Sequence, residues 1–112
     1  MNISQDCQRA RIYIGEADRS DGKPLYEALI FKARELGLSG ATVFRSPMGF
    51  GANSVVHSAK LLNLSSDLPI VVEIIDEEPK LQLFLKQIET MLESGLVTLE
   101  PVKVLHYKHR PA

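Results

Sequence analysis

The run LPIVVEII, residues 68–75, is the most strand-like stretch of the chain because it is dense in β-branched residues. The sequence DEEPK follows it directly and resembles a helix start, with Asp76 as the expected cap and acidic side chains near the positive end of the helix dipole. The stretch therefore predicts a strand that leads into an amphipathic helix, which we expect to end at Gly95. The apolar stripe of this expected helix consists of Leu81, Phe84, Leu85, Ile88, Met91 and Leu92.

The first half of the chain has the same plan. RARIYIG, residues 9–15, alternates between apolar and polar side chains and predicts a strand. The turn SDGKP follows, and Pro24 is suited to a first helical turn. Apolar residues then recur at helical spacing until Gly37, which is a typical C-terminal cap. ATVFR, residues 41–45, predicts the next strand.

A last strand is expected within residues 96–108, interrupted or bulged at Pro101. The predicted order β-α-β-β-α-β is the ferredoxin-like arrangement. The predicted fold class is therefore α+β, a four-stranded antiparallel sheet with two helices on one face. A chain of 112 residues suffices for one domain, which we assign to residues 9–108, with flexible tails at 1–8 and 109–112.

The sheet face opposite the helices is predicted to be apolar. If Ile12, Val43 and Val72 face the helices, the other face presents too many apolar residues for a monomer in water. We therefore expect an oligomer whose sheets face one another; the alternative is that the long loop or a tail covers this face. The residues concerned are Tyr13, Thr42, Phe44, Val71, Ile75, Leu105 and Tyr107.

Composition excludes several classes of function. The net charge is −1, with 13 basic against 14 acidic residues, and no basic stripe is present, which argues against nucleic-acid binding. There is no apolar run long enough for membrane insertion, and the polar start lacks a secretory signal, so a cytoplasmic protein is expected. Cys7 is the single cysteine, so neither an internal disulfide nor a Cys-rich zinc site can form.

The connection at residues 46–67 is long for a compact domain, and its apolar content is not typical of disorder. Residues 54–64 within it are compatible with a short helix. Gly49 and Gly51 permit close approach of another molecule, and their N–H groups can form an anion-binding nest. Phe50 between them is unusual for a simple turn, which favours a ligand or subunit contact.

GLSGATVFRSPMGFG, residues 37–51, resembles the nitrogen-regulatory PII signal proteins around their second strand and the base of their T-loop. Residues 9–108 as a whole resemble the PII-like family known as domain of unknown function 190. The resemblance implies a PII-like homotrimer that binds adenine nucleotides in clefts between subunits. By position it implies one wall of the cleft made of Gly40, Ala41, Thr42, Gly49, Phe50 and Gly51.

The second wall departs from the PII pattern. ESGLVTLEPVK, residues 93–103, lacks the Gly-x-Gly-Lys element that holds phosphate in PII proteins. Either the ligand is smaller or less charged, or another loop supplies the contacts. GEADRSDGKP, residues 15–24, is the candidate loop, although a solvated turn also explains it. The predicted ligand-binding set is Gly40, Ala41, Thr42, Arg45, Gly49, Phe50, Gly51, Asn53, Arg19 and Lys23.

The leading hypothesis is a signalling protein without catalytic activity, resident cofactor or metal site. It would bind a small anionic effector, with an adenine nucleotide as candidate, and regulate a partner protein through loop 46–67. The alternative is a small enzyme or a metal-binding trimer that uses His57 in the same cleft. Glu73 lies mid-strand among apolar residues and needs a partner; a Lys or Arg across strands in the oligomer is expected, and metal ligation is the second option.

Overall fold

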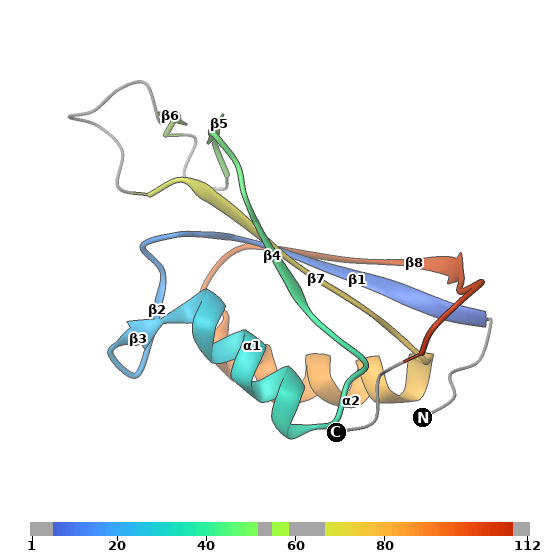
Figure 1. The fold of residues 1–112 in the computed structure, drawn as a ribbon. Helices are drawn as coiled ribbons and strands as arrows, with labels where there is room; N and C mark the ends of the chain where they lie inside the picture. The colour runs from blue at the N-terminus through green and yellow to red at the C-terminus, as the bar shows by residue number, and fades with distance from the viewer. Residues whose placement is uncertain (1–5, 52–54, 59–66, 109–112) are drawn as a thin grey trace.

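The computed structural model describes residues 6–51, 55–58 and 67–108, with side chains except at His57 (Figure 1). Four strands form one sheet in the order β4-β7-β1-β8, and every neighbouring pair is antiparallel. This order and the two helices confirm the predicted ferredoxin-like α+β fold. The sheet strands are β1 (Asp6–Gly15), β4 (Thr42–Arg45), β7 (Pro69–Asp76) and β8 (Leu96–Lys103), and the helices are α1 (Leu25–Glu35) and α2 (Glu78–Ile88), the latter extended by the 3-10 turn η1 (Glu89–Met91).

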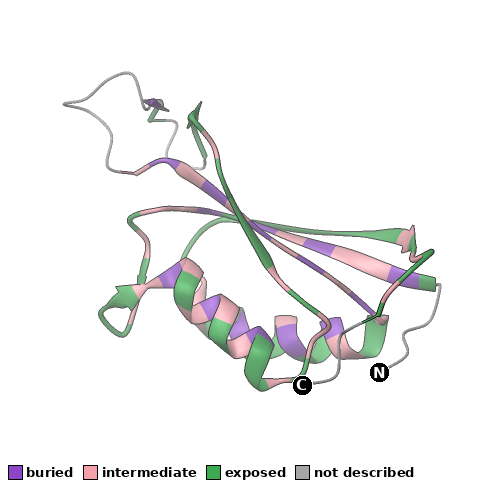
Figure 2. Cartoon of the chain, in the orientation of Figure 1, coloured by how far each residue is buried: buried purple, intermediate pink, exposed green. Residues whose placement is uncertain are grey.

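Both helices cover the same face of the sheet, and the buried residues gather between the two layers (Figure 2). The buried residues alternate along β7, and along β1 from Ala10 to Ile14, as a half-covered sheet requires. Among the described residues, no helix is long and apolar enough to cross a membrane. The largest fully buried apolar side chains are Phe84, Ile12, Leu29, Ile74, Leu81, Ile88 and Val72.

Two short hairpins leave the same end of the sheet (Figure 1). The first joins β2 (Arg19–Ser20) to β3 (Lys23–Pro24) and lies beside the start of α1. The second joins β5 (Met48–Gly49) to β6 (His57–Ser58) and belongs to the long connection. The expected short helix is not found at residues 55–58, where β6 forms at 57–58. The rest of that expected helix, residues 54 and 59–64, lies outside the described residues.

The end of α1 follows the sequence expectation. Gly37 has φ of 74°, its N–H donates to the carbonyl of Arg34, and the N–H of Leu38 donates to that of Ala33. This pair of bonds is a Schellman cap, whose left-handed residue is normally glycine.

Asp76 has a different role from the one expected. The residue that caps α2 is Glu77, and no side chain makes the capping bond. Asp76 is fully buried; its Oδ1 accepts from the N–H of Glu77 at 2.7 Å and its Oδ2 from the N–H of Ser39 at 2.8 Å. The carboxylate therefore joins the end of β7 to the turn after α1.

Three further features of the helices and strands differ from the sequence expectation. β1 begins at Asp6, so residues 6–8 are part of the sheet and only 1–5 of the expected tail lie outside the described residues. α2 ends at Ile88, well before Gly95. β8 runs through Pro101 without interruption, in register with Gln8. A proline is tolerated there because β8 is an edge strand, where one side needs no hydrogen bonds.

The open face of the sheet is partly apolar and partly charged. One row crosses all four strands, since Tyr13 pairs with both Val71 and Leu96, and Val71 pairs with Phe44. We call Phe44, Val71, Tyr13 and Leu96 the apolar row. Ile75 and Thr42 also lie on this face, as expected.

The expectation was wrong for the residues after β8. Leu105 lies beyond the end of β8 and is 85% exposed. Tyr107 turns to the helix side of the molecule, where its hydroxyl donates to the carbonyl of Ser39 at 3.0 Å. The chain leaves the sheet at Lys103, so strand alternation no longer fixes the direction of these side chains.

Candidate functional site

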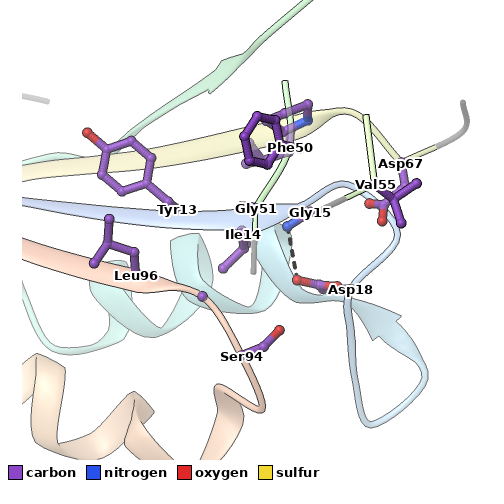
Figure 3. A pocket seen from close by; sticks show the side chains of 13 residues that line it. Tyr13, Ile14, Gly15, Asp18, Phe50, Gly51, Val55, Asp67, Ser94 and Leu96 are labelled. Atoms are coloured by element: carbon purple, nitrogen blue, oxygen red, sulfur yellow. Dashed lines mark hydrogen bonds between the residues drawn. The ribbon is translucent and has the colours of Figure 1, made fainter. Parts of the chain in front are cut away.

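A cavity of about 510 Å³ opens at the end of the sheet from which the two hairpins leave (Figure 3). Its volume lies within the range of small-molecule sites. Four parts of the chain meet there: the end of β1 with the loop that follows it, the β5–β6 hairpin, the residues that lead into β7, and the turn before β8. The described lining residues are Tyr13, Ile14, Gly15, Asp18, Phe50, Gly51, Val55, Asp67, Pro69, Ile70, Ser94, Gly95 and Leu96.

The turn into β8 depends on Gly95. Its φ is 125°, a conformation that side chains rarely adopt, and a Cβ at this position would lie 2.6 Å from the carbonyl oxygen of Tyr13. The glycine lets the chain pass close to β1 before pairing with it. Gly95 thus forms part of the cavity wall instead of ending α2.

The β5–β6 hairpin is held close to β7. The N–H of Ser46 donates to the carbonyl of Pro69 at 2.9 Å, and a Cβ on Gly49 would lie 2.9 Å from Cγ of Pro69. This close packing places Phe50 and Val55 at the cavity (Figure 3). Phe50 is nonetheless 66% exposed, so one side of its ring remains available to another molecule.

Two carboxylates shape the loop after β1. Oδ2 of Asp18 accepts from the N–H of Gly15 at 2.9 Å, the bond drawn in Figure 3, and Oδ1 of Asp67 accepts from the N–H of Ala17 at 2.8 Å. The N–H of Glu16 donates to the carbonyl of Leu68 at 2.9 Å. These bonds fix the loop against the start of β7. The charged side chains of the described lining are the two carboxylates, since it holds no lysine or arginine.

The structure brings only some of the predicted ligand-binding residues to the cavity. Phe50 and Gly51 line it, and Gly49 positions the hairpin that carries them. Arg45 lies beside it in register with Ile70, and its Nε contacts Oε2 of Glu16 at 3.2 Å.

The other members of the predicted set lie elsewhere. Thr42 begins β4 opposite Glu73, three positions along the strand from Arg45, and Gly40 and Ala41 precede it, so none of these three lines the cavity. Arg19 and Lys23 belong to the β2–β3 hairpin, and Asn53 lies outside the described residues. A role for these residues in ligand binding stays a prediction.

Sequence reasoning points to the segments before β8 and after β1, but in the second it favours Arg19 and Lys23, which do not line the cavity. It looked there for a phosphate-binding lysine, whereas the lining residues are Ser94, Gly95 and Leu96 in one segment and Gly15 and Asp18 in the other. The available signal was the glycine at each strand end, which marks close approach of another part of the chain: the backbone of Tyr13 at Gly95 and the side chain of Asp67 at Gly15.

The groups considered for catalysis or metal binding are placed as follows. The backbone of His57 pairs with Gly49 in the hairpin; its side chain lies outside what the structure describes. Glu73 is partnered by Arg11 on the adjacent strand of the same chain, with Nε to Oε2 at 2.9 Å, so the expected cation is present but does not come from another copy of the chain. Within the described residues, no three His, Cys, Asp or Glu side chains cluster as metal ligands.

Comparison with known sequences gives a consistent result. Residues 7–104 match the family DUF190, described as "Uncharacterized ACR". A UPF0166 protein of Aquifex aeolicus is 47% identical over 96 residues, which cover 86% of this chain and 90% of that protein. A UPF0166 protein of Methanocaldococcus jannaschii is 29% identical over 90 residues, covering 80% of this chain and 82% of the relative.

Solved structures share the fold at low sequence identity. CPII of Thiomonas intermedia, solved with ADP and bicarbonate, superimposes with a TM-score of 0.66 at 18% identity, covering 88% of each chain. A PII-like signalling protein of Thermus thermophilus gives a TM-score of 0.65 at 17% identity, with 93% of each chain covered. The GlnK–ATP complex of Bacillus subtilis gives 0.58 at 12% identity, covering 89% of this chain and 86% of GlnK.

Proposed function

Because the chain belongs to the DUF190 family and has the fold of PII-like proteins, we propose that it is a regulatory protein without catalytic activity that binds a small effector at the end of its sheet. The proposed class of effector is an adenine nucleotide, since CPII was solved with ADP and GlnK with ATP. The observation that carries the proposal is that Phe50 and Gly51, at the base of the long connection, line the cavity.

This position gives the effector a way to act on the loop. A ligand that contacts Phe50 and Gly51 binds one arrangement of residues 46–67 better than others and thereby shifts their population. Met48 and Val56 of the same hairpin are 59% and 45% exposed. We propose that this apolar surface meets the regulated partner protein.

The proposed assembly is a homotrimer that buries the apolar row. Phe44 is 50% and Leu96 57% exposed in the single chain, which is costly for large apolar side chains that lie together. Since Tyr13 and Leu96 belong both to this row and to the cavity lining, a subunit packed on the row would also border the cavity. The effector would then bind between subunits.

Native mass spectrometry of the full chain tests assembly and ligand together, and we expect three chains with bound adenine nucleotide. Calorimetry with ADP should show binding, and hydrogen exchange should show slower exchange of residues 46–58 when ADP is present.

Phe50→Ala should weaken binding about tenfold, the value of a lost base–aromatic contact. Met48→Ala is the control, since Met48 is exposed in the same hairpin but does not line the cavity. No binding of any adenine compound, together with a loop already protected without ligand, would refute the proposal.

A further inference from the structure

The loop after β1 does not present the groups of a phosphate site to the cavity. Phosphate-binding loops present free backbone N–H groups or cations to the anion. Here the N–H of Gly15 donates to Asp18 and the N–H of Ala17 donates to Asp67, so the loop after β1 has these donors already engaged by carboxylates. The charges that face the cavity from the described lining are negative.

Some described cations near the cavity or on the open sheet face are already paired with carboxylates. Arg45, the basic residue next to the lining residue Ile70, is paired with Glu16. On the open sheet face, Arg11 is paired with Glu73 and Arg9 with Glu100, so another copy packed on that face would bring partnered guanidinium groups. Within the described lining a phosphate chain would therefore meet two carboxylates and no lysine or arginine, an unfavourable arrangement in a partly closed site.

The same cavity suits the adenine base and the ribose of an adenine nucleotide. Phe50, Val55 and Leu96 provide apolar walls for a flat ring. The half-buried carboxylate of Asp18 is an acceptor for an amino group or a ribose hydroxyl, and the Ser94 hydroxyl belongs to the same lining (Figure 3). The lining thus favours a ligand rich in hydrogen-bond donors and poor in negative charge.

We propose that the cavity receives the base and ribose of its ligand and disfavours its phosphates, so that the protein responds to adenosine or its monophosphate in preference to the triphosphate. This inference rests on the function proposed above and specifies which members of the nucleotide class the site selects. Asp18 is the lining carboxylate whose charge tests the selection, because it accepts from the N–H of Gly15 through Oδ2, a bond that an amide oxygen can retain.

The test compares adenosine, AMP, ADP and ATP by calorimetry on the full-length protein, with EDTA present so that no metal masks the phosphates. We expect adenosine or AMP to bind at least about tenfold more tightly than ATP, which corresponds to one like-charge interaction at partial burial. The preference should shrink when NaCl is raised from about 0.1 M to about 1 M, because the Debye length falls from about 10 Å to about 3 Å.

Asp18→Asn should reduce the preference about tenfold, since the amide oxygen can still accept from Gly15 while the charge is removed. Asp21→Asn is the matched control: Asp21 is exposed in the β2–β3 turn with φ of 50°, a conformation that asparagine accepts, and should leave the preference unchanged. If Asp18→Asn does not fold, the wild-type series and its salt dependence still decide the question.

The outcomes separate the two proposals. ATP binding as tightly as AMP, or a preference that Asp18→Asn leaves intact, overturns this inference and leaves the regulatory function standing. Failure of all four compounds to bind removes the proposed nucleotide class, and this inference with it.

Discussion

Nε of Arg11 donates to Oε2 of Glu73 at 2.9 Å across the β1–β7 pair, on the face of the sheet that the helices do not cover. The hydrogen bond from Arg11 to the carboxylate raises the pKa of the guanidinium. Thr42 and Thr98 lie on either side of this pair, so that the four residues form a second row across the sheet. This polar row is two positions along the strands from the apolar row. The open face therefore offers an apolar band beside a charge-neutral polar one, a combination suited to a specific interface.

The ion pair should stabilise the fold only as a unit. Arg11→Met leaves the Glu73 carboxylate, whose side chain is only 20% exposed, without its partner, so the free energy of unfolding should fall. The double variant Arg11→Met, Glu73→Leu should recover most of the loss, because no uncompensated charge remains. Urea unfolding of the four proteins in a double-mutant cycle measures the coupling. Additive losses would contradict this account.

A charge in the apolar row should prevent assembly. Phe44→Glu puts a carboxylate into the proposed interface, where it would be desolvated without a partner, and should convert the proposed trimer to monomers. Phe31→Glu is the control, since Phe31 is 63% exposed on α1, on the helix side of the sheet. Light scattering coupled to gel filtration gives the masses. Two variants of equal oligomeric state would argue against an interface at this row.

Gly95→Ala should destabilise the protein by about 2 kcal/mol, because it adds a Cβ at φ of 125° that would lie 2.6 Å from the carbonyl of Tyr13. Gly40→Ala is the matched control: it has no atom within 4 Å of the added carbon and no positive φ, so its stability should be unchanged or slightly raised. Denaturant unfolding measures both. The Gly95 variant should also bind adenine compounds less well, since its adjustment moves a wall of the cavity.

The fold could be predicted from the sequence because the strands and helices have clean periods. The alternation of Ile12 and Ile14 with Tyr13 and the helical spacing of Leu81, Phe84 and Ile88 specify both layers. The continuity of β8 through Pro101 could not be predicted in this way. Pro101 indicated an interruption by local rules, but its tolerance depends on β8 being an edge strand, which is a property of the whole sheet.

The candidate site was harder to predict because it is assembled from separate segments. The Gly-Phe-Gly sequence indicated Phe50 and Gly51 as ligand-binding residues; both line the cavity, and their role in binding stays a prediction. The contribution of Asp18 depends on the loop after β1 turning back, which brings its carboxylate to the N–H of Gly15. Since side-chain and backbone partners of this kind leave no periodic pattern, charge alone had favoured Arg19 and Lys23 instead.

Cys7 provides a test of packing at the far end of β1. The side chain is 3% exposed, and burial, followed by the nearby carboxylate of Asp76, raises the pKa of its thiol above the ordinary value of 9.0. The unfolded chain therefore loses the thiol proton first as the pH rises, so the stability of the folded protein should decline from about pH 9.0 upward and level off above the folded-state pKa. Below pH 9.0 both states hold the proton and this contribution is constant.

The measurement is the difference between wild type and Cys7→Ala in urea unfolding across this pH range, because the difference removes the titration of lysines and tyrosines common to both. We expect wild type to lose stability relative to the variant as the pH rises through 9.0. A thiol reagent should modify native Cys7 only as fast as the strand opens, since the reactive thiolate is both disfavoured and covered. Rapid modification of the native protein at neutral pH, or a pH-independent difference, would show that β1 does not hold Cys7 in the buried position found here.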